Sequence, residues 1–121
     1  MDSVTEAAIR ETVATYVMGM TFGDAGQLRA AFHPRGVSAG HFGGALEWMG
    51  VEAFAEDCAA HALPAGAEVP AWEIEMIRTS GDTAVVIVTN VWAGEKFRDT
   101  LTLLEEDGRW RIVFKCFHHL A

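Results

Sequence analysis

The chain has 121 residues, of which half are hydrophobic, and its 17 acidic and 9 basic side chains give a formal net charge of -8. This length and apolar fraction are typical of one domain with a buried core, so we expect a single domain over residues 1–121. The acidic excess disfavours binding to nucleic acid or to anionic membranes. The sequence shows no signal-peptide pattern and no membrane-spanning apolar run, which predicts a cytoplasmic protein with reduced Cys58 and Cys116.

Helical patterns occupy much of the first half of the chain. An S-x-x-E capping box begins at Ser3, and apolar residues then recur at helical spacing, which predicts a helix over residues 3–22. Asp24 can cap a short second helix, which Pro34 ends. A third helix is predicted over residues 51–63.

Short apolar runs between glycine-containing turns predict strands in the rest of the chain. A bent strand is expected over residues 37–42, after a turn at residues 33–36. Four further strands are expected over 71–79, 83–92, 96–105 and 109–119. Helices followed by an antiparallel meander indicate an α+β fold with the helices on one face of the sheet.

The dipeptide Asp107-Gly108 predicts a two-residue turn that fixes the register of the last hairpin. In that register the pairs that share one face are Leu103 with Ile112, Leu101 with Phe114, Asp99 with Cys116, and Phe97 with His118. Because this face is the apolar one, it should meet the helices. Asp99 is then a carboxylate among apolar side chains.

The other face of the predicted sheet also carries apolar residues. Val113 and Phe117 lie on it in this register, and the run 84–88 is apolar on both sides. An antiparallel sheet covered on one face alone would alternate more cleanly between apolar and polar residues. A second copy of the chain is the expected cover, so we predict a homodimer through the outer sheet face.

Two separate stretches resemble the nuclear transport factor 2-like superfamily. The pattern Tyr-Val…Gly-Asp…Leu…Ala-Phe over 16–32 is similar to its first two helices, and F-x-D-x-L at 97–101 with D-G-x-W-x-I at 107–112 is similar to its last hairpin. The F-H-P at 32–34 and the ending at 110–115 resemble a SnoaL-like subgroup labelled putative lumazine-binding. The resemblance implies a cone-shaped, cystatin-like fold, in which a curved antiparallel sheet wraps round the helices and an apolar pocket opens at one end.

The resemblance therefore directs attention to aromatic residues that could line such a pocket and bind a small hydrophobic or aromatic ligand. The candidates are Tyr16, Phe32, Trp48, Phe54, Trp72, Phe97 and Phe114. The register of the hairpin that contains Trp72 and Trp92 is ambiguous, so either tryptophan could be the one that faces inward.

Asp99 and His118 are the first candidates for chemistry, because a carboxylate beside an imidazole can orient a general base. The resemblance suggests a role for Tyr16, since a tyrosine at the matching position of steroid isomerases donates to an oxyanion. Those isomerases carry their general base at the position of Gly40, and His41 is the nearest substitute.

Each of these residues also has a structural interpretation, as a hydrogen-bonded pair, a core aromatic or a surface histidine. No metal-ligand motif or cofactor fingerprint occurs, so neither a metal nor a cofactor is expected. Three functions stay open. They are a small-molecule-binding protein with an aromatic-lined hydrophobic pocket, an acid–base enzyme of isomerase, cyclase or dehydratase type acting on a hydrophobic carbonyl compound, and a protein-interaction module.

Overall fold

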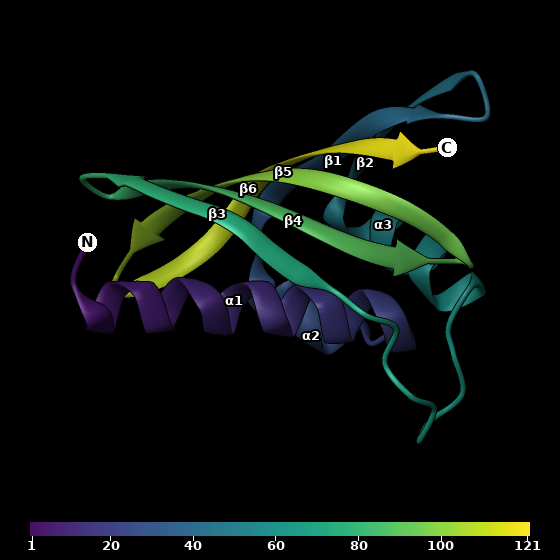
Figure 1. The fold of residues 1–121 in the computed structure, drawn as a ribbon, viewed down its shortest axis with the longest axis horizontal. Coiled ribbons are helices and arrows are strands. Elements are labelled where there is room, and N and C mark those ends of the chain that lie inside the picture. Colours follow the sequence, from purple (N-terminus) through teal and green to yellow (C-terminus); the bar gives the residue numbers. More distant parts are fainter.

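Three helices pack on one face of a six-stranded sheet in the computed structural model, which describes residues 1–121 (Figure 1). The elements are α1 (Ser3–Phe22), α2 (Ala25–Ala31), β1 (Phe32–Phe42), β2 (Ala45–Gly50), α3 (Val51–Ala60), β3 (Glu73–Ser80), β4 (Thr83–Trp92), β5 (Glu95–Glu106) and β6 (Arg109–Leu120). The strand order is β2-β1-β6-β5-β4-β3. Neighbouring strands are antiparallel except β1 and β6, which run parallel, so the expected α+β fold is confirmed with one unexpected pairing.

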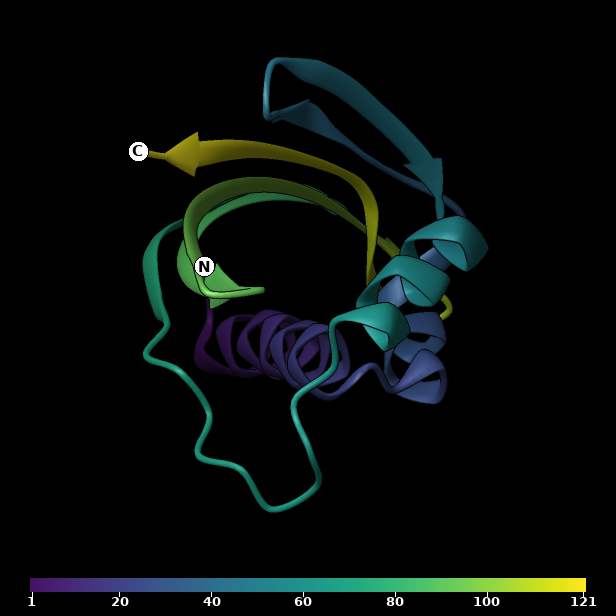
Figure 2. The ribbon, with the colours of Figure 1, turned by 90° about the vertical axis from the view of Figure 1, so that its right-hand side faces the viewer.

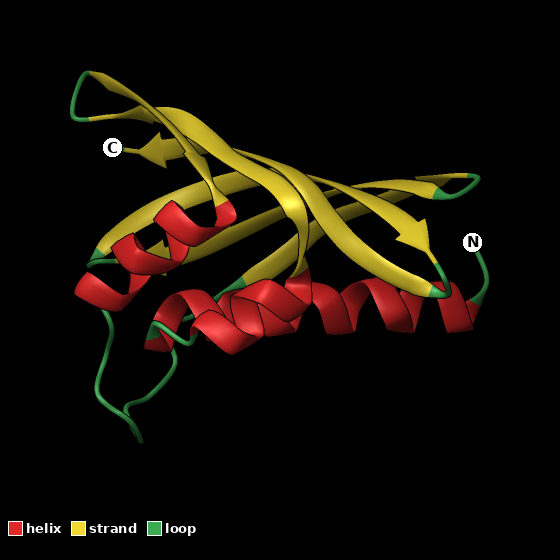
Figure 3. Ribbon diagram, turned by 180° about the vertical axis from the view of Figure 1, so that it is seen from behind, coloured by secondary structure: helices red, strands yellow, loops and turns green.

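The sheet is strongly curved and wraps around α1, which gives the molecule its cone shape (Figure 2). From behind, all three helices are seen on the concave side, with α3 beneath the end of the sheet that carries β1 and β2 (Figure 3). Nineteen buried side chains from the helices and the inner sheet face form one continuous hydrophobic cluster. None of the helices is long and apolar enough to cross a membrane.

The helix ends follow local capping chemistry. Asp2, not Ser3, caps α1, because the Asp2 carboxylate accepts a hydrogen bond of 2.7 Å from the backbone N–H of Thr5. Gly23 ends α1 in the left-handed conformation, with φ of 62°, which glycine adopts without strain. The third helix ends at Ala60 rather than at residue 63, because His61 leaves the helical region.

The first hairpin differs most from expectation. Residues 33–36 belong to β1 and do not form a separate turn. This part of β1 is irregular. Phe32 and Val37 pair with Ile112 and Phe114 of β6. Four residues lie between the two positions on β1, but only one lies between their partners on β6. β2 was not predicted, and it follows a turn at Gly43-Gly44, where both φ angles are positive.

A β-bulge at Val113 changes the register of the last hairpin. Leu103 lies opposite Ile112 as predicted, but Thr102 then pairs with Phe114, so Val113 is the additional residue. One extra residue moves every later side chain of a strand to the opposite face. The inner face of β6 therefore carries Lys115, Phe117 and His119, and the predicted inward positions of Phe114, Cys116 and His118 are wrong.

Gly40 allows β1 to pack closely against β6. It is buried, and a Cβ atom at this position would lie 2.5 Å from the backbone oxygen of Phe117 and 2.7 Å from its ring. A side chain fits here only if the strands separate. The absence of a side chain at this position is therefore a packing requirement.

Replacing Gly40 by serine should lower the free energy of unfolding by about 1–3 kcal/mol, because the added atoms overpack the contact with Phe117. Chemical denaturation measures this difference. Gly50→Ser is the matched control, since no atom lies within 4 Å of a Cβ there and serine is a favourable residue at the N-terminal cap of α3. Equal stability of the two variants would contradict this account of Gly40.

Candidate functional site

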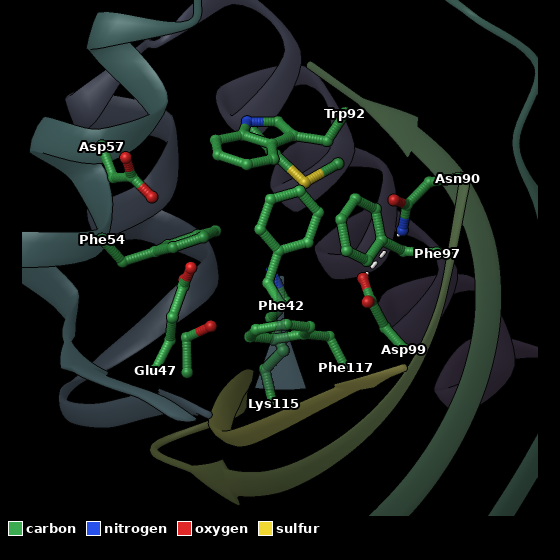
Figure 4. A pocket seen from close by; sticks show the side chains of 12 residues that line it. Phe42, Glu47, Phe54, Asp57, Asn90, Trp92, Phe97, Asp99, Lys115 and Phe117 are labelled. Carbon is green, nitrogen blue, oxygen red and sulfur yellow. Dashed lines mark hydrogen bonds between the residues drawn. The ribbon is translucent and has the colours of Figure 1, made fainter. Parts of the chain in front are cut away.

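A pocket lies between the inner face of the sheet and the helices α1 and α3 (Figure 4). The residues that line it are Met20, Ser38, Phe42, Glu47, Phe54, Asp57, Asn90, Trp92, Phe97, Asp99, Lys115 and Phe117. Its volume is about 30 Å³, which is enough for one or two water molecules. The pocket combines an aromatic wall with several charged and polar groups, a composition suited to binding an oriented ligand.

A hydrogen-bonded trio forms the polar part of the pocket. Asp99 on β5 is 1% exposed, and its Oδ2 accepts hydrogen bonds from the Tyr16 hydroxyl at 2.5 Å and from Asn90 Nδ2 at 2.7 Å. The second oxygen of Asp99 and the Oδ1 of Asn90 are buried and have no protein partner. Two hydrogen-bond acceptors are thus left for a ligand or for water.

Tyr16 holds the Asp99 carboxylate through its hydroxyl group. It projects from α1 into the core, fully buried, in edge contact with Phe32 and stacked on Phe54. Burial, and then the neighbouring charge of Asp99, hold the pKa of the Tyr16 hydroxyl well above its usual value of 10.0. The phenol therefore keeps its proton and acts as a hydrogen-bond donor.

Lys115 is the cationic group of the pocket. It is 6% exposed, and its ammonium lies 4.2 Å from the ring centre of Phe54, 5.3 Å from that of Tyr16 and 5.4 Å from that of Phe117. It forms no hydrogen bond or ion pair with another side chain. Aromatic faces attract such a cation through their ring quadrupoles.

Lys115 and Asn90 were missed as site residues. The register expected for the last hairpin placed Lys115 on the outer face, and the bulge at Val113 reverses this. Asn90 lies in an apolar strand and is 2% exposed, so a polar residue in a buried run was the signal that could have identified it.

Carboxylates and one tryptophan complete the pocket. Glu47 of β2 and Asp57 of α3 are half-buried, and Asp57 lies 3.6 Å from the ring nitrogen of His61. Trp92 faces the pocket and packs on His61 at 4.8 Å between ring centres. On the buried side of α3, removal from water raises the pKa of the Cys58 thiol to about 12, which makes it a poor nucleophile.

The structure divides the aromatic candidates into four groups. Phe54 and Phe97 line the pocket, while Tyr16 and Phe32 lie in the core behind it. Trp72 packs against the core outside the pocket, so Trp92 is the tryptophan that faces the pocket.

Trp48 and Phe114 need a correction. They contact each other on the outer face, with 5.7 Å between ring centres, and Trp48 is 64% exposed. Neither is a lining residue, because the bulge turns Phe114 outward and β2 presents Glu47, not Trp48, to the pocket.

The two histidines considered as bases also lie outside the pocket. His41 and His118 are neighbours in the register of β1 and β6, and both are exposed on the outer face. The predicted pair of Asp99 and His118 is therefore wrong, since the two side chains are on opposite faces of the sheet. No three histidine, cysteine, aspartate or glutamate side chains are close enough to hold a metal ion.

Comparison with known proteins agrees with this architecture. A family model described as "Putative lumazine-binding" matches residues 4–118. An NTF-2 like protein of unknown function from Silicibacter pomeroyi is 37% identical, with a TM-score of 0.92, covering 99% of this chain and 100% of its own. An NTF2-like protein of unknown function from Methylobacillus flagellatus is 29% identical, with a TM-score of 0.84, covering 100% and 96%.

More distant structures share the fold alone. A ketosteroid isomerase-like protein from Erwinia carotovora atroseptica is 19% identical, with a TM-score of 0.70 and coverage of 95% of each chain. No curated protein matches the sequence.

The burial of Tyr16 leads to a pH-dependent prediction. In the unfolded chain the phenol ionises near pH 10, whereas the folded chain keeps its proton to higher pH. The stability that this group contributes is therefore fully present below about pH 10 and is lost as pH rises toward the folded pKa. Since Tyr16 is the only tyrosine, its phenolate absorbance should appear together with unfolding in an alkaline titration. Phenolate absorbance in the folded protein near pH 10 would contradict the burial of this hydroxyl.

Proposed function

Because the chain belongs to the family described as "Putative lumazine-binding" and has the NTF2-like fold, we propose that it is a small-molecule-binding protein for a planar heteroaromatic ligand. The observation that carries the proposal is the buried Asp99 on an aromatic pocket wall, with one oxygen lacking a protein partner. A buried acceptor of this kind costs free energy until a donor reaches it.

The polar atoms of the pocket define which hydrogen-bond donors and acceptors the ligand must have. Asp99 Oδ1 and Asn90 Oδ1 call for N–H or O–H donors, and the Lys115 ammonium calls for an acceptor such as a carbonyl oxygen. The aromatic side chains favour a flat ring. Lumazine, which the family description names, is a fused bicyclic ring with N–H and carbonyl groups on one edge, and it meets each requirement.

The present volume of the pocket is too small for a bicyclic ring, so binding requires side-chain movement. Phe42 and Trp92 are half-buried lining residues, and Phe42 packs on Phe97 and His119 at the open end of β1. Rotation of these rings enlarges the pocket without moving the strands. Contacts between the ligand and these rings then replace the ring-to-ring contacts that the movement breaks.

Acid–base chemistry on a carbonyl compound is the second candidate function. The observation that favours it is the contact of 2.5 Å between Tyr16 and Asp99, which places a proton donor and a carboxylate beside the pocket. Gly40 counts against an isomerase mechanism of the steroid type, because the position leaves no room for an acidic side chain.

Titration with lumazine, followed by quenching of tryptophan fluorescence, tests the binding function. We expect saturable binding, since Trp92 lines the pocket. Lys115→Met should weaken it roughly 10- to 100-fold, because a charged hydrogen bond is lost. Lys96→Met, at an exposed position of β5, is the matched control and should bind as the original chain does. Absence of saturation, or equal loss in both variants, would contradict the proposal.

We further propose that the outer sheet face joins two copies of the chain. Register partners across all six strands form one uncharged row, which consists of Trp48, Ala39, Cys116, Thr100, Ile87 and Met76. Trp48 and Met76 at its ends are exposed. Two chains that each carry a net charge of -8 repel one another, and an uncharged row offers the surface on which close approach costs least.

Sedimentation velocity at micromolar concentration should show a dimer for the original chain. Trp48→Lys should shift the protein to monomer, because it places a charge in the uncharged row. Val4→Lys is the control, since Val4 is also highly exposed but lies on α1, away from this face. A monomeric original chain would refute the dimer and leave this face for another protein, the third function considered above.

A further inference from the structure

Lys115 is set apart from the other lysine of the chain by its surroundings. Lys96 is exposed on β5, whereas Lys115 is 6% exposed and lines the pocket (Figure 4). Its nitrogen lies against the faces of Phe54, Tyr16 and Phe117 and has no hydrogen-bond or ion-pair partner among the side chains. The pocket therefore contains a primary amine that is shielded from bulk water, and the side-chain movement described above would open it to a small ligand.

A primary amine in an apolar pocket is the side chain that forms Schiff bases with carbonyl compounds. The surroundings of Lys115 suit the charged product of that reaction. Aromatic faces stabilise a cation, whether an ammonium or an iminium. Glu47, Asp57 and Asp99 line the same pocket, and none of them forms an ion pair with Lys115 that would hold its nitrogen away from a ligand.

We propose that Lys115 condenses with a small hydrophobic aldehyde or ketone to give a protonated Schiff base. The ammonium first gives up one proton, and the amine nitrogen then attacks the carbonyl carbon. The C–N bond forms as the carbonyl π electrons move to oxygen, and the nitrogen then passes one proton to that oxygen. The hydroxyl of the resulting neutral carbinolamine takes up the proton that the ammonium released, and water leaves as the C–O bond breaks and the nitrogen lone pair forms C=N⁺. Overall, an ammonium and a carbonyl give an iminium and one water, with the positive charge conserved.

Asp99 is the proton carrier that the geometry offers for these steps. Lys115 pairs with Leu101 and Phe117 pairs with Asp99, so Lys115 and Asp99 are diagonal neighbours on the inner face. Tyr16 and Asn90 hold Oδ2, which leaves Oδ1 free to accept the proton from the ammonium and to return it to the departing hydroxyl. The Asp99 carboxylate points into the pocket in Figure 4.

This reaction uses the pocket of the proposed function but does not require lumazine as the ligand. Non-covalent binding depends on hydrogen bonds that the ligand donates to Asp99 and Asn90 and accepts from Lys115. Schiff-base formation depends on the nucleophilicity of one nitrogen. The two can succeed or fail separately.

Reductive trapping with propanal and sodium cyanoborohydride tests the proposal, with propanal as a probe of small size. After brief exposure, peptide mass mapping reports the propyl group on Lys115, Lys96 and the Met1 amine of the same molecule. We expect Lys115 to be modified roughly tenfold faster than Lys96, although Lys96 is the exposed residue. Equal or slower modification of Lys115 would overturn the proposal.

Two controls separate reactivity from other effects. In denaturant the preference for Lys115 should vanish, because it depends on the folded pocket, and a preference that persists would refute the role of the pocket. Asp99→Asn should reduce the rate at Lys115 and leave that at Lys96 unchanged, whereas an unchanged Lys115 rate would remove Asp99 from the mechanism. Trapping at Lys115 in a protein that fails to bind lumazine would support the covalent site and reject the non-covalent ligand. Lumazine binding without preferential trapping would have the opposite meaning.

Discussion

One extra residue in β6 determines which side chains the pocket contains. The bulge at Val113 leaves β5 regular and reverses the alternation of β6 beyond it. Without the bulge, Cys116 and His118 would face α1 and α3, and the ammonium of Lys115 would lie in solvent. With it, Lys115 and Phe117 join Asp99 on the inner face. The chemical character of the pocket is thus fixed by backbone geometry as much as by residue identity.

The burial of Asp99 is not explained by core packing. A carboxylate removed from water is unfavourable unless hydrogen bonds replace its hydration. Tyr16 and Asn90 replace part of that hydration at one oxygen, and the other oxygen stays without a partner. Such incomplete compensation is common where a protein reserves polar atoms for a ligand. Neighbouring Lys115 shows the same pattern with the opposite charge.

Sequence patterns predicted those parts of the fold that depend on local signals. The strand 83–92 was placed correctly because turns bound it on both sides. The inward direction of Asp99 and Phe97 was also correct, because it follows from the alternation within β5 itself. Positions beyond Val113 were assigned to the wrong face, because a bulge leaves no mark in the apolar pattern. β2 was missed because Leu46 and Trp48 face outward and are exposed, and Met49 is the one large apolar residue that packs against the core, so the strand has no inward apolar pattern.

The parallel pairing of β1 with β6 has a consequence for how the chain reaches this structure. β6 is the last strand in the sequence, yet it lies in the middle of the sheet and is the one link between the β1–β2 hairpin and the β3–β4–β5 meander. Until β6 is synthesised, the two halves of the sheet have no hydrogen bonds to each other. The pairing of β1 with β6 joins two strands that are far apart in the sequence. Bringing such distant segments together is entropically costly and slows folding. On the ribosome, the pocket can therefore form only after the C-terminal strand has emerged, and the exposed edges of β1 and β5 are the surfaces open to wrong pairing before then.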